Sequence, residues 1–253
     1  MSGMNDIATQ SHISPELTDG MSKEVESMLK AGIHLGHSKS KNHPAMQPYI
    51  FGVRNTIAII DLIKTEEKLR YAMNIVREIA SRGGVILFVG TRPGTRHVIL
   101  DTAKKAGMPY FIERWIGGAL TNYKMISKRV EQMETLEKER ETGGFDKYTK
   151  KERARLDDEI ARLKRFFDGL RTLKRMPDAV FVLDITHDTT AVNEARKMKI
   201  PVIALCDSNS NIDLINYPIP SNDHALPAVV YMLGKFTEAI EEGKRQLVEK
   251  KTE

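Results

Sequence analysis

Three short apolar runs rich in Val and Ile constrain the fold of this 253-residue chain more than any other feature. They lie within residues 84–95, 178–188 and 200–211, and each leads into a loop rich in Gly, Pro, Asp or Ser. A run of this kind is typical of a strand that is buried on both faces, as in a parallel sheet. Stretches with helical periodicity that end at Gly or Pro lie before and between the runs. We therefore predict an α/β fold, a Rossmann- or flavodoxin-like layered parallel sheet with right-handed crossovers.

The segment of residues 121–176 interrupts this alternation. Its apolar residues recur in steps of three and four, as in the seam of a coiled coil, at Ile126, Val130, Met133, Leu156, Ile160, Leu163, Phe167 and Leu170. A Gly pair separates the two series, and Thr149 and Glu152 have the spacing of a capping box at the start of a helix. The segment carries 16 Lys or Arg against 11 Asp or Glu, which accounts for the whole net charge of +5. We predict an inserted antiparallel coiled-coil hairpin of two α-helices.

These patterns divide the chain into five parts. We predict a disordered N-terminal tail (1–22), a first part of the α/β domain (23–120), the hairpin (121–176), a second part of the α/β domain (177–240), and a C-terminal helix end and tail (241–253). No stretch approaches the roughly 18 apolar residues of a membrane span. The first 22 residues lack the Lys and Arg of a signal or transit peptide. The single cysteine, Cys206, excludes an internal disulfide and points to a reducing compartment.

The loops after the predicted strands are where α/β proteins usually bind ligands, so an enzyme is one hypothesis. The best phosphate loop is "FVGTRPGTRHV", in which Gly90 and Gly94 are spaced as G-x-x-x-G. This spacing matches neither the dinucleotide fingerprint nor the P-loop. A nucleophile elbow is absent, and Cys206 lies in an apolar strand, where a thiol usually packs. We expect no catalytic residue, but the alternative of an α/β enzyme or regulatory domain that binds a nucleotide or sugar phosphate stays open.

Basic side chains in loops and at element ends favour a second hypothesis, which is RNA binding. Such residues can neutralise phosphates, and the sequence pI of about 9.1 is compatible with that role. The candidates are Lys39, Lys41, Arg54, Arg92, Arg96, Arg114 and Lys124. The only tryptophan, Trp115, is expected in the core, and Gly117 and Gly118 would let the chain turn from the sheet into the hairpin.

Several segments resemble, in the same order, the bacterial-type small ribosomal subunit protein two family of the 30S subunit. They are "MLKAGIHLGHSKSKNHPAMQPYIFGVRN", "LFVGTR", "ERWIGGALTN", "GGFDKYTKKE", "PDAVFVLDITHDTTAVNEARKMKIPVIALCDSNSN" and "YPIPSNDHA". Together they extend over about residues 24–240. One departure is "SKSKNHP" after His37, where the family usually has a basic and aromatic "RRWNP"-like sequence, so local contacts there should differ.

The resemblance implies a non-enzymatic structural protein that supports translation. Family members have an α/β domain with an inserted coiled-coil hairpin, and they bind 16S-type rRNA. They also dock neighbouring small-subunit proteins, including the large OB-repeat protein that gathers mRNA. The expected location is a cytoplasmic ribosome, with an organellar ribosome also open. No membrane, small-molecule substrate or obligatory cofactor is implied.

The resemblance also implies roles for individual residues. It places His34, Gly36 and His37 in an ordered N-terminal loop, and it makes Arg92 a phosphate contact. At the base of the hairpin it implies an orienting junction made of Arg114, Trp115, Gly117 and Gly118.

Histidines are concentrated in "AGIHLGHSKSKNHP", residues 31–44, which raises the question of a metal site. His34 and His37 are three residues apart, but the neighbouring glycines disfavour a helix, and the chain has no H-E-x-x-H or paired C-x-x-C. Asp residues follow the predicted strands at Asp184, Asp188 and Asp207. Only His37, together with a carboxylate such as Asp207, is retained as a candidate ligand of a structural divalent ion, Zn or Mg.

Overall fold

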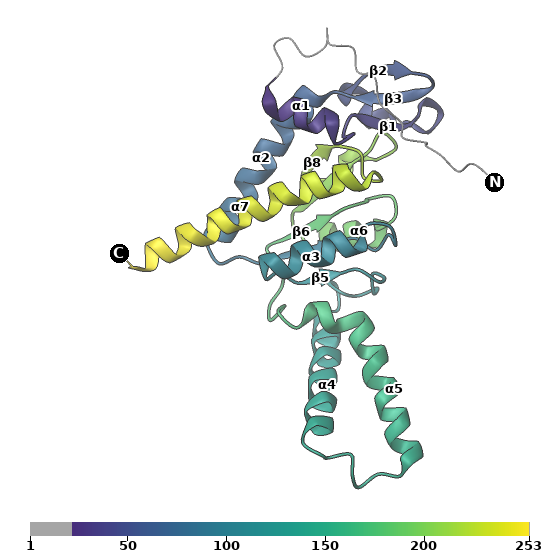
Figure 1. Cartoon of the computed structure of the whole chain (residues 1–253), viewed down its shortest axis with the longest axis vertical. Helices are drawn as coiled ribbons and strands as arrows, with labels where there is room; N and C mark the ends of the chain where they lie inside the picture. Colours follow the sequence, from purple (N-terminus) through teal and green to yellow (C-terminus); the bar gives the residue numbers. More distant parts are fainter. Residues whose placement is uncertain (1–21, 253) are drawn as a thin grey trace, which may run out of the picture.

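The computed structural model describes residues 22–252, so nearly all of the predicted tail lies outside the described residues (Figure 1). The described chain begins with helix α1 (Lys23–Lys30), which is capped by the Ser22 side chain. A three-stranded antiparallel sheet follows, with the order β1-β3-β2. Its strands are β1 (Leu35–Ser38), β2 (Ile50–Arg54) and β3 (Ile57–Ile60). The 3-10 helices η2 (Lys39–Lys41) and η3 (Pro44–Tyr49) connect β1 to β2.

A five-stranded sheet forms the body of the protein, and its order is β5-β4-β6-β7-β8. All four strand pairs are parallel. The strands are β4 (Ile86–Val89), β5 (Tyr110–Phe111), β6 (Ala179–Val182), β7 (Val202–Cys206) and β8 (Tyr217–Pro220). Every residue of β4, β6 and β7 is buried, as expected for strands covered on both faces. The predicted α/β fold with a layered parallel sheet is confirmed.

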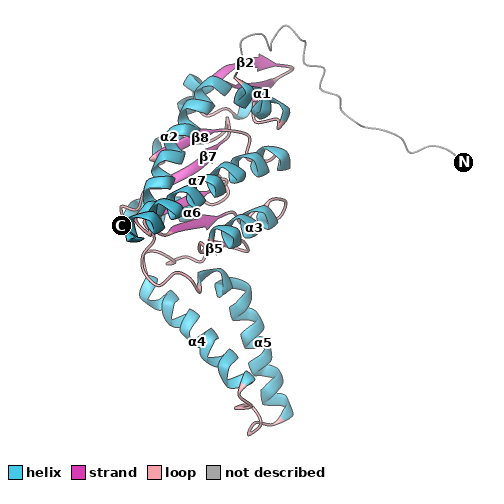
Figure 2. Cartoon of the chain, turned by 60° about the vertical axis from the view of Figure 1, so that its left-hand side comes forward, coloured by secondary structure: helices cyan, strands magenta, loops and turns pink. Residues whose placement is uncertain are grey.

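Helices cover both faces of this sheet (Figure 2). Side chains alternate along each strand, so Phe88 and Phe181 face one layer while Val89 and Val182 face the other. The first layer contains α2 (Leu62–Ser81), α3 (Arg96–Ala106) and α7 (Leu226–Thr252), and a cluster of Phe88, Phe181 and Phe236 rings lies beneath it. The second layer contains α6 (Thr189–Lys197) and the base of the hairpin; the short η5 (Ile212–Leu214) follows β7. Within residues 22–252, no helix is long and apolar enough to cross a membrane.

The hairpin extends away from the body at the end opposite to the three-stranded sheet (Figure 1). It consists of α4 (Tyr123–Glu141) and α5 (Lys150–Phe167), and η4 (Asp168–Leu170) leads back to the body. The predicted capping box is present: the Thr149 hydroxyl accepts from the Glu152 backbone N–H, and the Glu152 side chain accepts from the Thr149 N–H. Most predicted seam residues are buried, whereas Leu156 is only partly so. The two-helix insertion is therefore observed, and coiled-coil supercoiling stays a prediction.

An ion-pair cluster fastens the hairpin to its base. Glu137 of α4 lies 2.7 Å from Lys164 of α5 and 2.6 Å from Arg171, which follows η4. Hydrogen bonds from Arg171 foremost, and from Lys164, lower the pKa of Glu137 to about 2. Glu137 is therefore ionised over the whole physiological pH range.

Candidate functional site

Four aspartates gather where β6, β7 and β8 end, at the carboxyl edge of the parallel sheet. They are Asp184, Asp188, Asp207 and Asp223, and none is more than 4% exposed. Burial of charged carboxylates is costly unless each finds a cation or several hydrogen-bond donors. The contacts of each aspartate therefore determine what this edge can bind.

Arg92 supplies the positive charge for two of these aspartates. Its guanidinium contacts Asp184 directly, and Nη1 lies 3.6 Å from Asp223 Oδ1. Asp184 Oδ1 also accepts from the Thr186 hydroxyl at 2.6 Å and from two backbone N–H groups. Burial opposes ionisation of Asp184, but these bonds and the Arg92 charge lower its pKa overall. The charged form of Asp223 is stabilised by fewer hydrogen bonds, and burial raises its pKa to about 6.

The loop after β4, which was the best candidate for a phosphate cradle, is already occupied by a carboxylate. The Thr91 hydroxyl donates to Asp188 Oδ1 at 2.7 Å, and the Thr91 N–H donates to Oδ2 at 3.3 Å. Gly90 has a packing role, because a Cβ there would meet the Ile99 side chain at 2.7 Å. Burial raises the pKa of Asp188. The loop thus presents its donors to a protein carboxylate, in an acidic surrounding that repels a bound phosphate.

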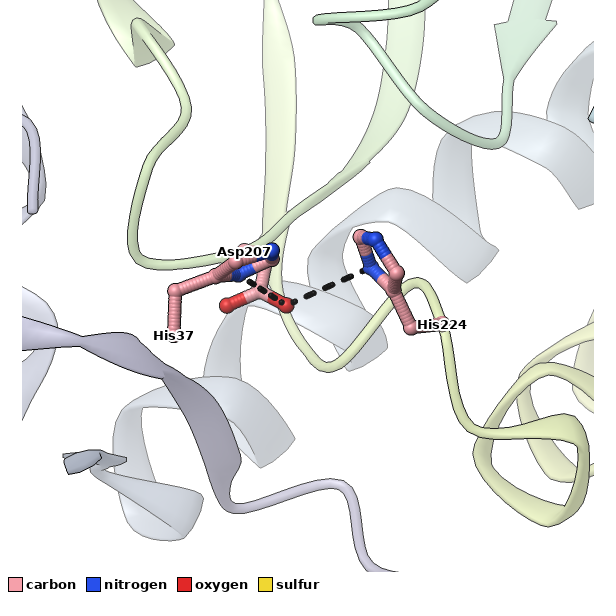
Figure 3. A group of neighbouring side chains, drawn as sticks. All are labelled: His37, Asp207 and His224. Carbon is pink, nitrogen blue, oxygen red and sulfur yellow. Dashed lines mark ion pairs between the residues drawn. The ribbon is translucent and has the colours of Figure 1, made fainter. Parts of the chain in front are cut away.

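His37, Asp207 and His224 converge at the same edge (Figure 3). Asp207 lies between the two imidazole rings, with Oδ2 at 3.1 Å from His37 Nδ1 and 3.9 Å from His224 Nδ1. The rings themselves make an edge-to-face contact, with their centroids 4.7 Å apart. The Asp207 carboxylate raises the pKa of His37. His224 Nδ1 also contacts the carboxylate of Asp223.

The backbone of β1 lies close to the loop that follows β7 at this edge of the sheet. A Cβ on Gly36 would meet Ser208 Oγ at 2.9 Å and the Ala58 carbonyl oxygen at 3.1 Å, so glycine lets β1 lie close to the loop after β7. The His37 N–H donates to Ser208 Oγ at 2.9 Å, and the His43 N–H donates to the Ser208 carbonyl at 2.8 Å. The segment predicted as an ordered loop is therefore partly a strand that docks on the loop after β7.

The three clustered histidines have three different roles. His34 lies just before β1, its Nδ1 is buried without a hydrogen-bond partner among residues 22–252, and burial lowers its pKa. His43 caps η3, because its Nδ1 accepts from the Ala45 N–H at 3.2 Å. Of the three, only His37 reaches Asp207, and these two residues lie close to His224.

A buried glutamate organises the junction between the body and the hairpin. Glu194 of α6 accepts from Trp115 Nε1 at 3.1 Å and from the Gly118 N–H at 2.7 Å through Oε1. Its Oε2 accepts from the Leu120 N–H and from both the N–H and the hydroxyl of Thr121, at 3.0–3.1 Å. Burial alone would raise the pKa of Glu194, but these donors lower it overall. Trp115 is 7% exposed and packs against Phe111, as expected for a core residue.

The glycines of this junction differ in their surroundings. Gly118 has a φ of +88°, a conformation that favours glycine, whereas a Cβ on Gly117 would meet open space. Arg114 is exposed and forms no ion pair within the described residues. Its predicted part in orienting the hairpin stays a prediction.

Two side chains of these clusters were not predicted from the sequence. His224 follows β8 in "SNDHA", and the rule that ligands gather at the carboxyl ends of parallel strands could have drawn attention to it. Glu194 had no such signal, because a glutamate in a helical stretch rich in polar and charged residues is expected to be exposed to solvent. Its burial follows from the position of α6 beneath the junction.

Comparison with known proteins decides the family. The family model described as Ribosomal protein S2 matches residues 28–243. The chain belongs to this family. Among curated relatives, the small ribosomal subunit protein uS2 of a Thermus thermophilus strain is 44% identical over 225 residues, which are 89% of this chain and 88% of the relative. The protein of the same name from Nitratiruptor sp. is 43% identical over 87% of this chain and 82% of its own length. That of Dehalococcoides mccartyi is 40% identical over 88% and 91%.

Membership of the S2 family confirms the family predicted from the sequence. Of the two function classes that the sequence left open, it selects the non-enzymatic ribosomal one over the α/β enzyme. The buried aspartates at the strand ends agree with this choice, because an anionic nucleotide or sugar phosphate would meet carboxylates there.

Proposed function

We propose that this chain is a structural constituent of the small ribosomal subunit that binds 16S-type rRNA through exposed cationic side chains and docks neighbouring ribosomal proteins. The observation that carries the proposal is the match to the S2 family over residues 28–243. The relatives are named as proteins of the small ribosomal subunit. Binding at the ribosome in the cytoplasm follows from the same proposal.

One cationic cluster lies on the three-stranded sheet. Lys39 and Lys41 belong to η2, and Arg54 ends β2. The Lys39 N–H donates to the Thr56 carbonyl at 2.8 Å, which brings η2 beside the turn that follows Arg54. All three cations are exposed, and none forms an ion pair with residues 22–252. Their charges are therefore free to neutralise phosphates.

Two further predicted cations, Arg114 and Lys124, lie near the base of the hairpin and are exposed without an ion pair in the described chain. Arg92 and Arg96 differ from them. Arg92 is paired with buried aspartates, and Arg96 Nη1 lies 2.8 Å from Glu113 Oε1. We therefore place the phosphate contacts mainly on the five unpaired cations, while contacts by Arg92 and Arg96 stay predictions.

Protein docking has support from the outer surface of the three-stranded sheet. Phe51 is 78% exposed, Val53 is 47% exposed, and both lie on β2 two residues apart. Such exposed apolar side chains are typical of contact surfaces. We propose that neighbouring small-subunit proteins, among them the large OB-repeat mRNA-binding protein, dock on this protein.

The RNA contacts can be tested with the variant Lys39→Ala/Lys41→Ala/Arg54→Ala. Each phosphate contact that is lost should reduce the slope of log K against log salt by about one unit, so we expect a slope smaller by about two to three. The measurement is a titration of small-subunit rRNA with the full chain at several salt concentrations.

The matched control is Lys104→Ala/Lys105→Ala/Lys197→Ala, which removes the same charge from exposed positions on α3 and α6. We expect it to change the slope by less than about one unit. Equal slopes for both triple variants would show that the cluster on the three-stranded sheet makes no specific phosphate contacts.

A further inference from the structure

We propose that a recess at the amino edge of the parallel sheet binds an unpaired guanosine of RNA, with Arg196 and Lys199 on its phosphate and Asp213 on its base. The recess has a volume of about 370 Å³, which is within the range of small-ligand sites. It lies between the end of α6, the residues just before β7, and the segment from η5 to the start of β8. The buried aspartates lie at the opposite edge of the sheet. The inference rests on the proposed function, which supplies rRNA as the partner.

Lys199 has a backbone conformation that glycine normally adopts. The same pair of backbone hydrogen bonds closes five helices, and in each of them the residue just past the helix end has a positive φ. In α6 this residue is Lys199, with a φ of +57°. A side chain is disfavoured in this left-handed region, so the lysine at this position indicates a function for its side chain. In the other four helices the residue is glycine, namely Gly32 after α1, Gly83 after α2, Gly107 after α3 and Gly143 after α4.

Two unpaired cations line the recess. Arg196 belongs to the last turn of α6, and Lys199 follows the end of the helix. Both side chains are exposed, and neither forms an ion pair or a hydrogen bond with residues 22–252. Two neighbouring cations without protein partners are suited to bind a phosphate.

Asp213 adds a hydrogen-bond acceptor to the same recess. Its carboxylate is exposed and forms no ion pair in the described part of the chain. An ionised carboxylate can accept two parallel hydrogen bonds. Among the RNA bases, guanine has two adjacent donors, N1–H and N2–H, on the Watson–Crick edge that proteins read in unpaired RNA. The carboxylate therefore selects guanine, and its charge disfavours an acidic protein segment in the recess.

The rest of the lining suits the flat face of a base. Bases of unpaired nucleotides bind to proteins through apolar contacts on their faces and hydrogen bonds on their edges. Asn216 connects two walls of the recess, because its Oδ1 accepts from the Val202 N–H at 2.9 Å. The shape of the recess is thus fixed by the start of β7 and β8. Its apolar lining consists of Ile200, Pro201, Leu214 and Ile215.

The test is a titration of two single-stranded RNAs with the full chain at physiological salt. Each RNA has about twelve nucleotides, all of them uridine except for one central guanosine or one central adenosine. We expect the guanosine RNA to bind about tenfold more tightly, as for one well-placed pair of base contacts. Asp213→Asn should remove this preference, because an amide offers one donor and one acceptor in place of two acceptors.

The variant Lys199→Gly separates binding from folding. Glycine is favoured at this φ, so Tm should rise by about 2–4 °C. Loss of the phosphate contact should at the same time weaken binding of the guanosine RNA by about fivefold. The matched control is Lys197→Ala, which removes the same charge from an exposed position of α6 outside the recess. It should change the affinity by less than about twofold and keep the preference for guanosine.

Four outcomes would contradict the proposals. Equal binding of the two RNAs by the wild-type chain, or unchanged RNA affinity of Lys199→Gly, would overturn the guanosine site. Tighter binding of free guanosine 5′-monophosphate than of the guanosine RNA would show that the ligand is a free nucleotide, and would overturn it too. Failure of the wild-type chain to bind small-subunit rRNA in the same assay would instead contradict the proposed function.

Discussion

Replacing Glu194 with alanine should destabilise the protein by about 4 kcal/mol, which corresponds to a fall in Tm of about 8–16 °C. The reason is that one buried carboxylate accepts five hydrogen bonds from the junction, from Trp115 to Thr121. Without it, those donors would be left unsatisfied in a site where Glu194 itself is only 9% exposed. Thermal or urea unfolding of the full chain measures the effect.

The control for this prediction is the neighbouring residue on the same helix. Asn193 is exposed on α6, so Asn193→Ala should change the free energy of unfolding by less than about 0.5 kcal/mol. Similar losses in the two variants would mean that Glu194 does not organise the junction.

The contribution of Glu194 should also depend on pH. Its donors lower its pKa below the ordinary value of 4.5, so the folded state binds a proton less readily than the unfolded state. The stabilisation is then fully present above pH 4.5 and is lost as pH falls through the folded-state pKa. We expect the stability difference between wild type and Glu194→Gln to be largest near neutral pH and to shrink below about pH 4.5. A difference that grows on acidification would contradict this assignment.

Gly169→Ala should have the second large effect, a loss of about 3 kcal/mol. Gly169 lies in η4 at the base of the hairpin, and an added Cβ would meet the Tyr110 carbonyl oxygen at 2.2 Å and its ring at 2.5 Å. Since the closest atom belongs to the backbone of β5, the clash cannot be relieved by a side-chain rotation. The hairpin base would have to move away from the sheet.

Gly117→Ala is the matched control for Gly169. A Cβ at this junction glycine meets nothing within 4 Å, so the stability should change by less than about 0.5 kcal/mol. Both variants can be compared by urea unfolding. A harmless Gly169→Ala would show that the hairpin base packs less closely on β5 than the structure indicates.

The parallel sheet and the hairpin could be predicted because their signals are local. Apolar runs predicted the strands β4, β6 and β7. Apolar residues at heptad spacing predicted the helices α4 and α5, and the capping box at Thr149 predicted where α5 begins. The order of the strands carried no such signal, since it depends on contacts between distant segments.

The three-stranded sheet was not predicted. Its strands have only four or five residues, with the sequences LGHS, IFGVR and IAII, and these lack the alternation of apolar and polar residues that would have predicted half-buried strands. For the candidate site, His37 and Asp207 were predicted as ligands of a divalent ion; the two side chains lie 3.1 Å apart, and ion binding stays a prediction. His224 and Glu194 were missed, because their partners lie far away in the sequence.

The central claim, that this chain is a structural protein of the small ribosomal subunit, is tested most directly by sedimentation at native expression level. Cell extract is separated on a sucrose gradient, and the protein is quantified in each fraction. We predict that it co-sediments with the small subunit in near-stoichiometric amount and is released by high salt, as expected for phosphate contacts. Abundant free protein at the top of the gradient, with none on the small subunit, would contradict the account.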